Sequence, residues 1–103
     1  IVGEGTGVWN FTHVEDAAEA VSLSLEGPQG IYNIVNDIAS EMAVWLPAYA
    51  RFLKAPEPLQ RSVKEELLIN GPTSVFRATE MRGASNEKAE RDLGFLPRPL
   101  QWL

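Results

Sequence analysis

The sequence predicts an α/β fold, in which a few short, parallel strands pack with four to five helices. Short apolar runs of strand composition alternate with longer stretches in which apolar residues recur at helical spacing. The connections between these stretches are short, as they are in compact α/β domains. The 103 residues suffice for one domain.

The first three elements predict a crossover. Residues 9–14, "WNFTHV", have the β-branched and aromatic composition of a strand. "EDAAEAVSLSLEG" then has the apolar stripe of a helix, with Glu15 and Asp16 in its first turn and Gly27 and Pro28 ending it. "GIYNIV", residues 30–35, resembles a buried strand. A strand, a helix and a strand with short connections predict a parallel, right-handed crossover.

A second helix is expected from Ser40 as N-cap to about residue 54. Pro47 lies within it, so the helix must either begin late, near Trp45, or kink at the proline. A third helix is expected from Pro58 at its first position to a stop at Gly71.

Two short helices complete the prediction. "TSVFRATEMR" favours one helix, capped by Thr73 or Ser74. "SNEKAERDLGF" favours another, capped by Ser85 or Asn86 and ended by Gly94, after which the chain folds back at residue 95.

The segment "GEGTGV" invites comparison with a dinucleotide-binding loop. Such a loop connects a strand to a helix, and its third glycine lies three places after its second. Gly3, Gly5 and Gly7 alternate instead, and they lead into a strand. We therefore interpret the segment as a plain turn.

Composition and charge exclude several classes of protein. The net charge of −5, from 14 acidic and 9 basic residues, disfavours nucleic-acid binding. No apolar run approaches the length of a membrane helix. The absence of cysteine is compatible with a cytoplasmic location, and with His13 as the only histidine we expect no metal site. The start without Met and the end at "LQWL" indicate a piece of a longer protein.

No catalytic residue can be assigned. His13 lacks a "GxSxG" nucleophile, so a structural hydrogen bond is its favoured role. Glu15 and Asp16 are adjacent and point in different directions on a helix, so they do not form a catalytic pair. Neither tyrosine has a lysine four positions later, the arrangement that couples proton and hydride transfer.

Three segments, each a weak signal alone, resemble one family when they are taken together in sequence. "GEGTGVWNFTHVEDAAEAV", "GIYNIVND" and "SNEKAERDLGF" resemble, in this order, the C-terminal third of extended short-chain dehydrogenases/reductases, the NAD-dependent epimerase/dehydratase or nucleoside-diphosphate-sugar epimerase family. The resemblance implies that residues 1–103 are the substrate-binding part of a Rossmann-type oxidoreductase or isomerase. The missing N-terminal Rossmann portion would hold NAD or NADP and the Tyr-x-x-x-Lys pair. This part would itself bind no cofactor and perform no catalysis.

The resemblance also implies a substrate site. Trp9, Asn10 and His13 would border the pocket of a small-molecule substrate, and Arg82 would contact an anion. Their alternatives are a core side chain, a turn residue, a hydrogen bond at the strand end and, favoured for Arg82, a solvated charge. Sugar-nucleotide epimerases often have Arg-Asp where Trp9 and Asn10 stand, which favours another small alcohol or carbonyl substrate over a sugar nucleotide.

Two other functions remain open. The chain could be a non-catalytic binding or regulatory module derived from the same fold, or a freestanding interaction domain. Without its Rossmann portion, such a chain would expose apolar surface and sheet edges, so we expect it to self-associate.

Overall fold

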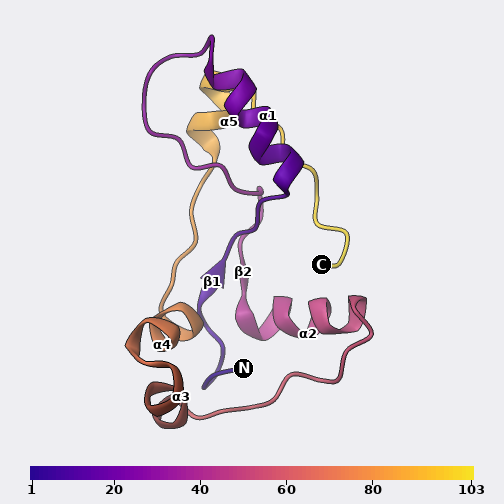
Figure 1. Cartoon of the computed structure of the whole chain (residues 1–103), viewed down its shortest axis with the longest axis vertical. Helices are drawn as coiled ribbons and strands as arrows, with labels where there is room; N and C mark the ends of the chain where they lie inside the picture. The colour runs from indigo at the N-terminus through magenta and orange to yellow at the C-terminus, as the bar shows by residue number, and fades with distance from the viewer. The chain divides into compact units, whose positions relative to one another are not determined.

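The computed structural model describes all 103 residues, which form two compact units (Figure 1). The first unit comprises Ile1–Trp9, Ser40–Gly83 and Gln101–Leu103. The second unit comprises Asn10–Ala39 and Ala84–Leu100.

Five helices and two short strands make up the secondary structure. The first unit contains β1 (Val8–Trp9), β2 (Ser40–Glu41), α2 (Met42–Phe52), α3 (Val63–Asn70) and α4 (Pro72–Thr79), and the second contains α1 (Val14–Ser24) and α5 (Glu87–Leu93). None of the five helices combines the length and the apolar character that a membrane crossing requires.

The sheet differs from the prediction. β1 pairs with β2 in the antiparallel direction, with Val8 opposite Glu41. Parallel pairing is confined to two single bridges, one between Val8 and Arg82 and one between Val2 and Arg61. The predicted parallel strand–helix–strand crossover is therefore wrong.

Residues 30–35 do not form the predicted strand, because a single backbone hydrogen bond and two side-chain hydrogen bonds stand in place of a ladder. Asn36 donates its backbone N–H to the Phe11 carbonyl at 2.9 Å, and its side-chain oxygen accepts the Phe11 N–H at 2.9 Å. The Thr12 hydroxyl donates to the Ile34 carbonyl at 2.6 Å. An apolar run in the sequence cannot reveal that its partners will be side chains.

Helix α1 agrees with the prediction and begins one residue earlier than expected. His13 is its N-cap, and the His13 Nδ1 accepts the Glu15 backbone N–H at 3.0 Å. Asp16, in the first turn, is buried, with 3% of its surface exposed. Arg98 donates to this carboxylate from its backbone N–H at 3.0 Å and from Nε at 2.9 Å. The C-terminal segment of the second unit is thereby tied to the start of α1.

Helix α2 begins before its proline. Ser40, the predicted N-cap, lies in β2, and Glu41 takes the N-cap position instead. The Met42 N–H donates to the carbonyl of Gly7, the residue before β1, at 2.9 Å, and this bond fixes the start of the helix. The helix contains Pro47 and continues to Phe52, so a late start near residue 45 is wrong.

Helices α3 and α4 begin at other residues than the sequence predicts. Ser62 caps α3, because its hydroxyl accepts the Glu65 N–H while the Glu65 carboxylate accepts the Ser62 N–H. This capping box sets the start at residue 63 and not at Pro58. Gly71 ends α3 as predicted, but it also caps α4, and Pro72 takes the first position of that helix. The predicted caps Thr73 and Ser74 therefore lie inside α4.

The last helix, α5, follows the prediction and completes the core of the second unit. Asn86 is its N-cap and Gly94 ends it in the left-handed conformation, with φ 69°. Phe95 then folds back and is 1% exposed. It packs with Ala20, Ala89 and Leu93, and three partly buried side chains surround this cluster: Leu23, Tyr32 and Ile34.

The glycines of "GEGTGV" act as a turn before β1. Gly3 and Gly5 have φ of 55° and 62°, the left-handed region that glycine tolerates best. Gly7 serves a close approach: a Cβ there would lie 2.2 Å from the carbonyl oxygen of Arg77.

We expect Gly7→Ala to destabilise the chain by about 2 kcal/mol or more, because the added methyl meets rigid backbone. Gly30→Ala is the matched control, since the atom nearest its methyl would be the flexible Nζ end of Lys88 at 2.8 Å. Urea unfolding measures both free energies of unfolding. Equal losses in the two variants would contradict the close-approach role of Gly7.

The Asp16 contacts generate a prediction for pH. Burial raises the pKa of the Asp16 carboxyl, but the hydrogen bonds and the charge of Arg98 outweigh this effect, so its pKa lies below the ordinary value of 3.8. A lowered pKa in the folded chain means that this stability is present above the unfolded pKa and is lost as the pH falls through the folded pKa.

Asp16→Asn is therefore expected to lower the free energy of unfolding at neutral pH, with the difference from the native chain shrinking below about pH 4. Glu19→Gln, on an exposed position of the same helix, is the control. Urea unfolding at a series of pH values measures the difference. A deficit that persists unchanged into acid would contradict the role of the charged carboxylate.

Candidate functional site

One face of the small sheet carries a row of three side chains. Val8 in β1 is paired with Glu41 in β2 on one side and with Arg82 on the other. Residues paired across strands project from the same face of a sheet. Glu41, Val8 and Arg82 thus form what we term the cross-strand row.

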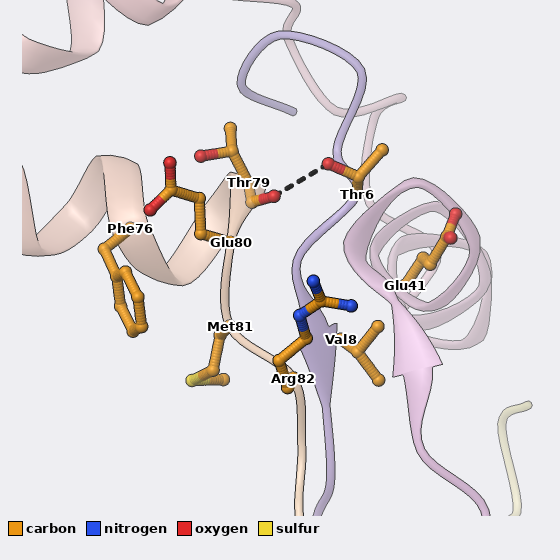
Figure 2. A pocket seen from close by; sticks show the side chains of 8 residues that line it. All are labelled: Thr6, Val8, Glu41, Phe76, Thr79, Glu80, Met81 and Arg82. Atoms are coloured by element: carbon orange, nitrogen blue, oxygen red, sulfur yellow. Dashed lines mark hydrogen bonds between the residues drawn. The ribbon is translucent and has the colours of Figure 1, made fainter.

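A cavity of about 650 Å³ opens on this row (Figure 2). Helix α4 and the segment after it supply most of its other walls. The Thr6 hydroxyl closes one side by donating to the Thr79 carbonyl at 2.8 Å. The lining residues are Thr6, Val8, Glu41, Phe76, Thr79, Glu80, Met81 and Arg82.

The cavity holds charges of both signs. Figure 2 shows the Arg82 guanidinium between the carboxylates of Glu41 and Glu80 in the view. No ion pair joins Arg82 to either carboxylate, although the other ion pairs of the chain, such as Arg61 with Glu66, are formed at 2.9–3.1 Å. Phe76 and Met81 add apolar surface. The cavity can therefore offer an anion-binding group, hydrogen-bond acceptors and an apolar contact.

Trp9 does not line this cavity. It follows Val8 in β1, and successive side chains of a strand point to opposite faces. Its indole N–H donates to the Arg77 carbonyl at 2.7 Å, and its ring centroid lies 5.0 Å from that of Trp45. Trp45 lies 6.3 Å from Trp102, which in turn lies 4.9 Å from Tyr49. Trp9 thus belongs to an aromatic cluster of the first unit.

Asn10 and His13 belong to the second unit, where both make structural contacts. The Asn10 side chain accepts the Ala84 N–H at 2.6 Å and donates to the Asn36 carbonyl at 3.3 Å. His13 caps α1. Of the four predicted site residues, only Arg82 lines the cavity, and a substrate contact of Trp9, Asn10 or His13 stays a prediction.

Glu41, Glu80 and Thr6 were not predicted from the sequence. Each is a common polar residue without a motif around it, and Glu41 fell in a predicted helix. Their convergence depends on the register of β1 with its two neighbours, which no local pattern encodes.

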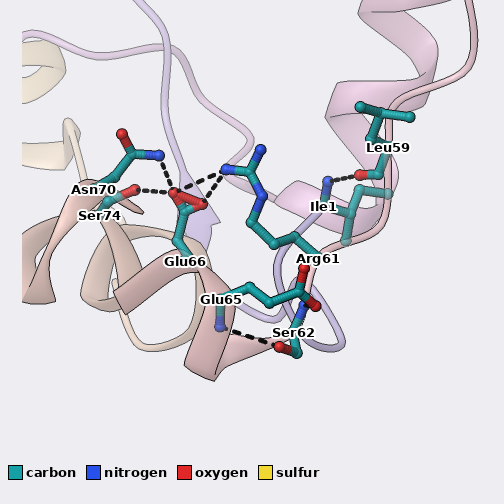
Figure 3. Close-up of polar contacts among 8 residues, drawn as sticks. All are labelled: Ile1, Leu59, Arg61, Ser62, Glu65, Glu66, Asn70 and Ser74. Atoms are coloured by element: carbon teal, nitrogen blue, oxygen red, sulfur yellow. Dashed lines mark hydrogen bonds and ion pairs between the residues drawn. The ribbon is translucent and has the colours of Figure 1, made fainter. Parts of the chain in front are cut away.

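A second group of charged side chains is fully engaged (Figure 3). The buried Glu66 carboxylate accepts hydrogen bonds from Asn70, from Arg61 at 3.1 Å and from Ser74 at 3.3 Å. The hydrogen bond from Asn70 is the main reason that the pKa of Glu66 lies below its ordinary value. Its acceptor capacity is used within the fold, so we assign this cluster a structural role. The chain contains no group of three or more side chains that could hold a metal ion.

The capping role of His13 can be tested by substitution. His13→Ala should lower the free energy of unfolding by about 1 kcal/mol, because the cap of α1 is lost. His13→Asn should keep it near the native value, since asparagine is a good N-cap. Urea unfolding of both variants measures this. If alanine costs nothing, the capping role is wrong.

The chain is similar to parts of two known enzymes, a reductase in sequence and an epimerase in fold. No protein-family model matches the chain. A 3-diazoavenalumate denitrifying reductase from a Streptomyces species is 37% identical over 101 residues, which are 95% of this chain and 33% of that protein. The crystal structure of UDP-glucuronic acid 4-epimerase from Bacillus cereus in complex with NAD matches with a TM-score of 0.62 and 16% identity, over 96% of this chain and 28% of that chain.

The chain thus spans about a third of the length of the reductase that it matches. The resemblance to one part of an NAD-dependent epimerase or reductase, drawn from three sequence segments, is confirmed. The chain has the fold of one part of an NAD-binding epimerase and is related in sequence to one part of a reductase.

Proposed function

We propose that this chain is the substrate-binding C-terminal region of an NAD(P)-dependent reductase, which transfers hydride between the nicotinamide and a small substrate. The observation that carries the proposal is the 37% identity with the reductase over nearly the whole chain. The epimerase, at 16% identity, supports the fold alone. We therefore favour a reductase over an epimerase or a dehydratase.

The cofactor would be held outside this region. A dinucleotide loop passes from a strand into a helix, whereas Gly3, Gly5 and Gly7 form a turn into β1. These residues do not fit a pyrophosphate, and we derive no cofactor contact from them. The epimerase that shares the fold contains NAD. NAD or NADP is accordingly assigned to the part of such a protein that this chain does not cover.

The cavity supports a small substrate rather than a sugar nucleotide. Two carboxylates and one guanidinium give it a net negative charge, which repels a diphosphate. Arg82 can bind and orient a single carboxylate or other anion through two parallel hydrogen bonds. Val8 and Met81 offer apolar contacts beside it. This chain's part in the reaction would be to bind and orient the substrate.

The exposed apolar side chains are consistent with a missing partner surface. Val21 and Leu25 on the second unit are 65% and 81% exposed, and Val44 and Phe52 on α2 are 54% and 51% exposed. In the proposed enzyme, the Rossmann portion would cover part of this surface. Self-association of the isolated chain stays a prediction with the same physical basis.

The test is to sequence the reading frame upstream of Ile1, express the whole protein, and measure oxidation of NADH and NADPH with 3-diazoavenalumate. We expect a nucleotide-binding domain with a Tyr-x-x-x-Lys pair, and turnover with this substrate. Arg82→Gln should raise KM by roughly tenfold or more with a smaller change in kcat, because a charge-assisted contact made by bound substrate is lost.

Arg51→Gln, at an exposed position of α2, is the matched control and should leave both constants unchanged. A glycine loop upstream without the tyrosine and lysine would overturn the enzyme in favour of a binding module. An upstream frame without a nucleotide-binding domain would refute both.

A further inference from the structure

We propose that the cavity binds a small ligand with an anionic group at one end and a cationic or hydrogen-bond-donating group at the other. The anion would bind Arg82, the opposite end would bind Glu41, and the apolar middle would lie over Val8. This inference names the ligand class of the cavity, and its biological meaning rests on the proposed function. Its test measures binding and needs no turnover.

The cross-strand row places its two charged residues on either side of Val8. Glu41 and Arg82 flank Val8 on two different neighbours. Adjacent strands lie about 4.8 Å apart, so the backbones at the two ends of the row are separated by about 10 Å. Both side chains leave the same face of the sheet, and their charged groups make no ion pair with each other. A ligand with two ends can satisfy both.

Neither Arg82 nor Glu41 uses its side-chain charge in an ion pair within the fold. Arg61, Arg91 and Arg98 all form ion pairs within the fold. Arg51, Arg77 and Arg82 form none, and of these only Arg82 lines the cavity, together with Glu41 and Glu80. Glu41 is the N-cap of α2, yet its side chain makes no capping hydrogen bond. Both ends of the cross-strand row therefore keep their full capacity for a ligand.

The other side chains that line the cavity limit the class of ligand that it can bind. Glu80 adds a second carboxylate to the cavity, so a ligand with two or more negative charges would be repelled. A purely cationic ligand would meet Arg82, and a purely anionic one would meet Glu41 and Glu80. Val8, Phe76 and Met81 favour an apolar spacer between the two ends. A zwitterion with an aliphatic or aromatic middle satisfies all of these groups.

The experiment is an NMR titration of the full chain with three probes of equal carbon length: ε-aminocaproate, caproate and n-hexylamine. We expect ε-aminocaproate to bind at least about tenfold more tightly than either singly charged probe, because it gains a second charge-assisted contact. Its chemical-shift changes should map to Val8, Glu41 and Arg82.

Variants test the two ends separately. Arg82→Gln should weaken ε-aminocaproate about tenfold or more and abolish the preference for it over n-hexylamine. Glu41→Gln should weaken it similarly and abolish the preference over caproate. The double exchange Arg82→Glu with Glu41→Arg should restore binding, with the probe reversed. Arg51→Gln and Glu57→Gln, both at exposed positions, should change nothing.

Equal binding of the three probes, absence of any binding, or shifts that map outside the cavity would overturn the proposal. The double exchange also guards against misfolding, because a restored affinity requires a folded cavity. A failure here together with turnover of the whole protein would reject the ligand class and leave the proposed reductase intact. Binding without turnover would reject the reductase alone.

Discussion

The first unit depends on the backbone hydrogen bonds of Val8 in β1 and of Gly7, the residue before this strand. The Gly7 N–H donates to Ala78 and the Val8 N–H to Met81, while the Gly7 carbonyl accepts the Met42 N–H. These bonds, at 2.6–2.9 Å, join the strand to the end of α4, to the segment after it and to the start of α2. The approach is close enough to exclude a Cβ at residue 7. The cavity exists because this small sheet places three chain segments in register.

In the second unit, buried polar side chains hold distant chain segments together. Asp16 binds Arg98 across 82 residues of sequence. The Asn86 side chain donates to the Val35 carbonyl at 2.9 Å and to the Asp37 carboxylate at 2.8 Å. Buried polar groups are costly unless they are satisfied, so each contact fixes one arrangement of the irregular segments around α1 and α5. The apolar core around Phe95 is small, and these contacts supply the specificity that it cannot.

Some charged side chains form ion pairs within the fold, whereas those that line the cavity do not. Glu66, Asp16 and Arg98 are engaged within the fold. The charged groups of the cavity are not. Charged side chains that line a cavity and form no ion pair within the fold, and not a sequence motif, make the site around Arg82 a candidate for ligand binding.

The sequence by itself determined the helices and their ends where the signal is local. The stripe of α1, the Asn86 and Gly94 ends of α5 and the turn at Gly3 and Gly5 depend on residues close in sequence, so their patterns predicted them. The relationship to an epimerase or reductase also followed from three short segments. Of the four candidate site residues, Arg82 lines the cavity, and its contact with a substrate stays a prediction.

Only the tertiary structure decided the pairing of strands and the make-up of the cavity. The antiparallel partner of β1 and the contacts of Phe11 and Thr12 with residues 34–36 depend on register between distant segments. A shift of one residue would exchange the two faces and move Glu41 and Arg82 out of the cavity. No local propensity distinguishes these registers, because the deciding hydrogen bonds join residues that lie dozens of positions apart.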